Sequence, residues 1–266
     1  MSSDASRVGP ALPALDDRLV APETRFEMLE GRLVHVSPAD APHGMRHSKV
    51  SALLEAHTGL ELTVASDMLT RTSDGTDVAP DVSVFPSAPD PVTCKRQLEQ
   101  LAFEVVSTQS LGNAATKAAQ LAARGVRRVF AIDVERSRAL EWSAALGTWS
   151  VLDPAGHIDD PALDVPLPIE DLVTTARADD AVARALLRKH NPVLVERLAE
   201  RRAEGKAEGR AEGKAEAVIM VLTARGIALD DVTRARLLGE RDPHRLDRWI
   251  ARATTCTTIA ELDAEL

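Results

Sequence analysis

One carboxylate inside an apolar run constrains the fold of this chain more than any other feature. Residues 101–106 read LAFEVV, which has the length and the β-branched and aromatic content of a buried strand, and Glu104 stands in its middle. A buried carboxylate is costly unless a cation or hydrogen-bond donors compensate it. The sequence therefore predicts either a functional partner for Glu104, such as a metal ion, or a plain structural salt bridge, for which Arg127 is the candidate.

Two flanking segments carry further groups that suit a catalytic site. Residues 80–85, PDVSVF, predict a strand that begins at Asp81. Residues 112–124 predict an Ala-rich helix that contains Lys117 and ends at Gly125.

These residue types point to metal chemistry if the two predicted strands are neighbours. Asp81 and Glu104 would then repel each other unless a cation lay between them, and Mg²⁺ prefers such oxygen ligands. The main-chain carbonyl of Val105 could supply a third oxygen. We therefore predict a Mg²⁺ site, with Mn²⁺ as the other candidate ion, at which Lys117 orients or deprotonates a water molecule.

The remaining patterns predict an α/β fold with a mixed central sheet flanked by helices. A strand, a helix and another apolar strand follow one another between residues 101 and 134, an order typical of parallel neighbours. A hairpin with its turn at Glu30 and Gly31 is expected earlier in the chain. Other expected elements are a helix over 42–59, strands over 61–70 and 78–85, and a surface loop over 86–95.

The chain divides on composition into four parts. We expect a flexible arm over residues 1–22, the α/β domain over 23–192, a linker over 193–217 and a small helical module over 218–266. The linker contains the repeat AEGKAEGRAEGKAEA, whose rows wind around a helix without forming one apolar seam. It predicts a marginal solvated helix or a flexible spacer, and pairing with a second copy as a coiled coil is the alternative. Four short helices are expected from residue 218 onward.

Charge and cysteine content restrict the class of protein. The formal net charge is −9, and the acidic excess lies within the first 170 residues, so the domain lacks the general basic character of a nonspecific nucleic-acid binder. The two cysteines form no CxxC pair, and no run of eighteen apolar residues or signal-like start occurs. We expect a cytoplasmic protein without a membrane span.

The ordered motifs resemble a known family. The hairpin FEMLEGRLVHVSP, a following His-Gly, PDVSVF, and FEVVS with a lysine thirteen residues after the glutamate resemble the Uma family of restriction-endonuclease-like proteins, within the PD-(D/E)XK nuclease superfamily. The resemblance covers residues 25–133. It implies a restriction-endonuclease-like fold in which Asp81 and Glu104 are metal ligands, Lys117 is the catalytic lysine and Glu30 completes the site.

Two functional hypotheses follow. The first is a Mg²⁺-dependent endonuclease acting on nucleic acid, with DNA the favoured substrate. The second is a catalytically inactive nuclease-fold protein that assembles, as a homo-oligomer, through its C-terminal helices. A further pair, His43 and His47, has the spacing of zinc ligands on a helix but lacks a third ligand in the sequence, so we interpret it as a polar or substrate-facing helix surface.

Overall fold

The computed structural model describes residues 12–21, 23–36, 39–107, 111–174 and 178–263. Its contacts divide the chain into a first unit, Met1–His190, and a second unit, Asn191–Leu266. Residues 1–11 and 22 of the predicted N-terminal arm, together with residues 108–110 and 264–266, lie outside the described residues. The described part of the arm contacts the rest of the first unit, since the amide of Leu19 donates to Asp77 Oδ2 at 2.9 Å.

The first unit is built on a six-stranded sheet in the order β10-β9-β8-β7-β6-β3. Its strands are β3 (Leu62–Ser66), β6 (Val82–Pro86), β7 (Leu101–Val106), β8 (Arg128–Asp133), β9 (Arg138–Ser143) and β10 (Thr148–Val151). Only β7 and β8 are parallel, and the other pairs are antiparallel. The predicted mixed sheet, including the parallel pair joined by a helix, is therefore confirmed.

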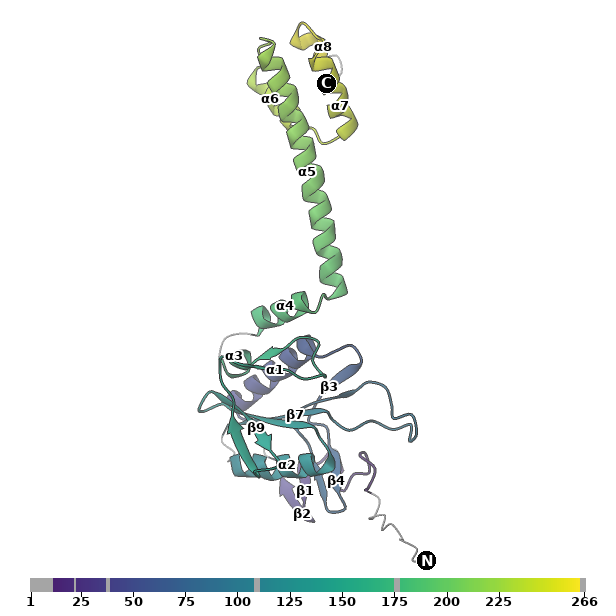
Figure 1. The fold of residues 1–266 in the computed structure, drawn as a ribbon, viewed down its shortest axis with the longest axis vertical. Coiled ribbons are helices and arrows are strands. Elements are labelled where there is room, and N and C mark those ends of the chain that lie inside the picture. The colour runs from purple at the N-terminus through teal and green to yellow at the C-terminus, as the bar shows by residue number, and fades with distance from the viewer. Residues whose placement is uncertain (1–11, 22, 37–38, 108–110, 175–177, 264–266) are drawn as a thin grey trace, which may run out of the picture. The chain divides into compact units, whose positions relative to one another are not determined.

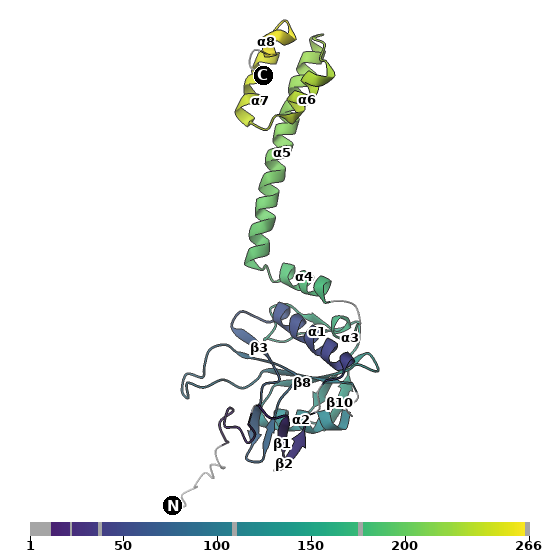
Figure 2. The same cartoon turned by 180° about the vertical axis from the view of Figure 1, so that it is seen from behind.

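Helices α1 (Ala41–His57) and α2 (Leu111–Arg124) cover opposite faces of this sheet (Figure 1), and the view from behind shows the same layers (Figure 2). Side chains alternate along β7: Phe103 and Val105 pack with Leu54 of α1, whereas Ala102 packs with Leu121 of α2. Because successive strand residues point to opposite faces, Glu104 faces the layer of α2.

A second sheet, in the order β2-β1-β5-β4, packs beside α2. Its strands are β1 (Phe26–Leu29), β2 (Arg32–His35), β4 (Thr70–Ser73) and β5 (Thr76–Val78). Glu30 and Gly31 form the predicted two-residue turn, with φ of 50° and 77°, as a hairpin turn with two left-handed residues requires. Leu29 and Val78 pack in one cluster with Ala118, which brings β1 close to α2.

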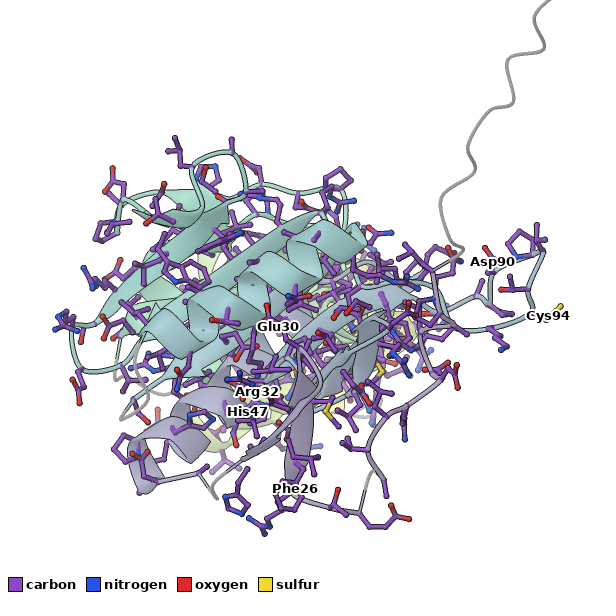
Figure 3. All side chains as sticks on the ribbon, turned by 90° about the horizontal axis from the view of Figure 1, so that it is seen from below. Phe26, Glu30, Arg32, His47, Asp90 and Cys94 are labelled. Carbon is purple, nitrogen blue, oxygen red and sulfur yellow. The ribbon has the colours of Figure 1, made fainter. Side chains whose placement is uncertain are left out.

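The first unit is completed by short elements around the core. These are β11 (His157–Ile158), β12 (Leu167–Pro168), α3 (Ile169–Val173) and α4 (Asp179–Arg188). Between β6 and β7, the loop that carries Asp90 and Cys94 projects from the body of the unit, as predicted for this surface segment (Figure 3).

The second unit is helical throughout its described elements: α5 (Pro192–Ala224), α6 (Asp231–Gly239), α7 (Pro243–Ala253) and α8 (Ile259–Asp263). The repeat and the predicted helix at residue 218 form one continuous helix, α5, so the separate helix was wrong. Alanine, glutamate, lysine and arginine favour the helix strongly, and no proline interrupts the segment.

Only the end of α5 has a buried face. Ala211, Ala215, Val218 and Leu222 follow one another at intervals of four, three and four residues and pack in one cluster with Trp249 of α7. Every residue from 196 to 210 is exposed. Ala211 and Ala215 of the repeat therefore begin the core of the second unit, whereas the residues that precede them in the repeat remain solvated.

Replacing Gly213 with alanine should stabilise the second unit by about 1 kcal/mol, because a glycine inside a helix costs that much relative to alanine. A Cβ at this position would meet nothing within 4 Å. Denaturant unfolding of the full chain, followed by circular dichroism, measures the effect. The matched control is Gly125→Ala, which should destabilise the first unit because φ at Gly125 is +114°. Equal effects of the two substitutions would contradict this account.

Candidate active site

The ammonium group of Lys117 lies at the centre of the candidate site. Residues 114, 118 and 121 form the buried face of α2, and Lys117 belongs to the same side of the helix. Its Nζ lies 3.0 Å from Glu104 Oε2 and 3.1 Å from Glu27 Oε1, and it donates to the carbonyl of Ala79 at 2.7 Å. Three acceptors thus match the three N–H groups of the lysine.

Asp81 lies at the start of β6, beside Glu104. Because Val82 is paired with Phe103 in the antiparallel register, the next pair along the two strands is Asp81 and Glu104. The amide of Val105 donates to Asp81 Oδ2 at 2.5 Å, and His43 Nε2 lies 3.5 Å from Asp81 Oδ1. Burial alone would raise the pKa of Asp81, but the contacts with His43, Lys117 and Val105 outweigh it and lower the pKa.

One carboxylate oxygen of Glu104 is buried without a partner among the described residues. This oxygen is Oε1, whereas Oε2 contacts Lys117. Burial raises the pKa of Glu104 to about 8, with added repulsion from Asp81 and Glu27 and partial compensation by Lys117. Buried polar atoms are normally satisfied, so an orphaned carboxylate oxygen calls for a missing ligand.

The donor set fits a divalent cation. Three carboxylates, those of Glu27, Asp81 and Glu104, surround the single ammonium of Lys117. When all four groups are ionised, the cluster carries two surplus negative charges, which one divalent ion would balance. Carboxylate oxygens are the ligands that Mg²⁺ and Mn²⁺ accept most readily.

Lys117 remains an ammonium ion in this environment. Burial would lower its pKa, but the nearby carboxylates of Glu104, Glu27 and Asp81 outweigh burial and raise the pKa above the ordinary lysine value. The group can therefore neutralise negative charge and donate hydrogen bonds, whereas it is a poor proton acceptor near neutral pH.

Of the four side chains singled out in the sequence, the structure brings three together. Asp81, Glu104 and Lys117 converge, whereas Glu30 is exposed in the hairpin turn, where its amide donates to Thr76 Oγ1 at 3.2 Å (Figure 3). The carbonyl of Val105 belongs to the strand that carries Glu104. Arg127 pairs with Asp160, so the structural salt bridge between Arg127 and Glu104 is wrong.

Glu27 is the acidic residue of the hairpin that reaches the site. It is buried on β1, contacts Lys117, and accepts a hydrogen bond from the amide of Ala79 at 2.9 Å. Like Glu104, Glu27 is a carboxylate within an apolar strand segment, and this pattern could have identified it. The segment FEML is, however, too short to show which face of the strand is buried.

The substitution Glu27→Gln should destabilise the first unit by about 1–3 kcal/mol, because it removes one charged acceptor of a buried ammonium. Glu30→Gln is the matched control on the same hairpin, and the exposed position predicts a change within about 0.5 kcal/mol. Denaturant unfolding of both variants provides the comparison. A larger loss for Glu30→Gln would assign the acidic role to the turn instead of the strand.

A mixed sheet with two opposed acids on neighbouring strands, and a lysine from the next helix, defines a restriction-endonuclease-like α/β protein. The chain belongs to the Uma2 family, whose model, described as "Putative restriction endonuclease", matches residues 12–167. The family resemblance inferred from the motifs is thereby confirmed.

Among the solved structures that are similar to part of the chain is one described as a "putative nuclease belonging to DUF820" from Anabaena variabilis, with 16% sequence identity and a TM-score of 0.47. The match covers 56% of this chain and 89% of that one. No curated protein matches the sequence. No helix among the described residues is both long and apolar enough to cross a membrane.

Proposed function

We propose that this protein is a metal-dependent endonuclease that hydrolyses phosphodiester bonds. The observation that carries the proposal is the buried Oε1 of Glu104, which lies beside Asp81 and the ammonium of Lys117 and has no partner in the described part of the chain. The description of the family as restriction endonucleases supports DNA as the substrate.

Asp81, Glu104 and the main-chain carbonyl of Val105 are the residues that would hold Mg²⁺, or Mn²⁺ in its place. When bound, the ion supplies a Lewis acid that stabilises negative charge on a phosphoryl group and lowers the pKa of water. The amide of Val105 holds the carboxylate of Asp81 in place through Oδ2, so the ligand on β6 is oriented by the strand that bears Glu104.

Lys117 acts as a cation in this proposal. Its contacts with Glu27, Glu104 and the carbonyl of Ala79 fix Nζ at the ends of the two strands. A fixed ammonium stabilises the charge that develops on the phosphate in the transition state and orients the attacking water by hydrogen bonding. Its raised pKa favours orientation over deprotonation, the two roles predicted from the sequence.

The test is cleavage of plasmid DNA, single-stranded DNA and RNA by the full-length chain with Mg²⁺, Mn²⁺ or a chelator. We expect cleavage of DNA that requires the metal and is lost in Asp81→Asn. Asp90→Asn, in the projecting loop between β6 and β7 (Figure 3), provides a matched control with unchanged cleavage. Absence of cleavage of all three substrates, or equal cleavage by the Asp81 variant, would contradict the proposal.

The second candidate function is assembly through the C-terminal helices. Its supporting observation is the exposure of three apolar side chains in the first turns of α5, with exposed fractions of 64% for Val193, 47% for Val195 and 46% for Leu198. Light scattering on wild type and on a variant with serine at these three positions tests it. A homo-oligomer that becomes monomeric in the variant, without DNA cleavage by either protein, would favour assembly over catalysis.

A further inference from the structure

Two histidines of α1 face the candidate active site from the other side of Asp81. His43 and His47 are four residues apart, so their side chains share one face of the helix. One ligand atom from each of His43, His47 and Asp81 lies within 4.8 Å of the other two. The carboxylate at the start of β6 is therefore a third side chain of a metal-binding type beside the two histidines, which the sequence did not identify.

Asp81 presents its two oxygens to different partners. Oδ2 accepts the hydrogen bond from the amide of Val105, whereas Oδ1 lies 3.5 Å from His43 Nε2. The oxygen on the helix side is thus separate from the one that binds the main chain of β7. A cation at Oδ1 would leave the hydrogen bond to Val105 intact.

The orientation of the His47 ring is fixed by the main chain of Asp81. Its Nε2 lies 2.6 Å from the main-chain oxygen of Asp81. A carbonyl is an acceptor only, so Nε2 is the donor, and in the neutral imidazole Nδ1 then keeps the lone pair. Histidine ligands of metals are commonly oriented in this way, with one ring nitrogen bonded to a carbonyl and the other left for the ion.

The surroundings of the three groups are half-buried and anionic. His43, His47 and Asp81 are each partly exposed, which leaves access from solvent. The carboxylates of Asp40 and Asp67 act electrostatically on His43, and the amide of Asp67 donates to the main-chain oxygen of Asp81 at 3.2 Å. The negative field favours a cation, while the partial burial weakens the competing hydration of the ion.

We propose that His43, His47 and Asp81 form a second cation site, which binds a divalent transition metal such as Zn²⁺. Imidazole nitrogen suits Zn²⁺ and its neighbours in the first transition row, whereas Mg²⁺ prefers oxygen ligands only. Two nitrogens and one carboxylate oxygen leave coordination positions for solvent, as open zinc sites do. This site goes beyond the proposed nuclease function, because it requires neither nucleic acid nor Glu104.

Metal titration of the full-length chain, without nucleic acid, tests the site. Co²⁺ serves as the spectroscopic probe, and Zn²⁺ is added as the competitor. We expect one equivalent of Co²⁺ to give visible absorption bands that Zn²⁺ abolishes and an excess of Mg²⁺ does not. His43→Gln and His47→Gln should each weaken Zn²⁺ binding at least about tenfold, since each removes a direct ligand.

Two further variants separate this site from the carboxylate site and from chance surface binding. Glu104→Gln should retain the Co²⁺ bands, and so should His157→Gln, which changes an exposed histidine paired with Asp159. Circular dichroism and thermal unfolding verify that each variant is folded. Absence of Co²⁺ or Zn²⁺ binding, unchanged binding in both α1 variants, or loss of the bands in Glu104→Gln would each overturn the proposal.

Discussion

Replacing Lys117 with methionine is expected to lower the rate of DNA cleavage by a factor of about 10²–10³, the usual effect of removing one fixed donor from a developing anion. Methionine has a similar length but no charge, so Glu27 and Glu104 lose the ammonium that contacts both of them. Single-turnover cleavage with saturating Mg²⁺ measures the rate.

The same substitution also leaves two carboxylates without their shared cation, which predicts a loss of stability of about 3–5 kcal/mol. Denaturant unfolding must therefore accompany the kinetics, and rates are compared at a temperature where the variant is folded. The exposed Lys95→Met is the matched control, with no expected effect on either quantity. A folded Lys117→Met variant that cleaves at the wild-type rate would remove the lysine from the mechanism.

Replacing Trp249 with alanine is expected to destabilise the second unit by about 3–5 kcal/mol, because it opens a large cavity in a small core. The indole is 2% exposed and packs in the cluster of Val218, Leu222 and Leu246, with the guanidinium of Arg245 5.3 Å from the ring centroid. The helices of this unit have no other core among the described residues, so the loss should extend to the packed end of α5.

Hydrogen exchange resolved by peptide distinguishes a local from a general effect. Protection should fall across residues 211–262 of Trp249→Ala and remain unchanged across β7 and β8, since the two units have separate cores. Val232→Ala, at a position 69% exposed, is the control within the same unit. Equal loss of protection in both units would show that they unfold together.

Much of the candidate site could be predicted because its members carry strong local signals. Glu104 is an acid within a buried strand, and strand pairing alone places Asp81 opposite it. The contact of Lys117 with Glu104 was predictable only in outline, because it depends on how α2 crosses the sheet. That crossing is set by the packing of Ala114, Ala118 and Leu121 against the strands. The sequence shows that these residues share one face of the helix, but not which strand residues they contact.

The contacts of Glu27 with Lys117 and of His43 with Asp81 could not be predicted from the sequence. Glu27 reaches Lys117 because a separate small sheet packs against α2, and no local pattern encodes the docking of one sheet beside another. Helix α1 covers the face of the six-stranded sheet that lies opposite α2. Its first turn brings His43 to Asp81 at the start of β6. Both contacts join residues distant in sequence, so they appear only when the layers are assembled.

The alternation along β7 has a consequence for how related chains can vary. Val106 points to the same face as Glu104 and packs with Ala114 of α2, one turn before Lys117. Position 106 of the strand and position 117 of the helix therefore face one interior layer. A lysine at position 106 would point toward the layer that holds Glu104 and Lys117, provided that the strand keeps its phase, since a shift of one residue would turn Glu104 toward α1.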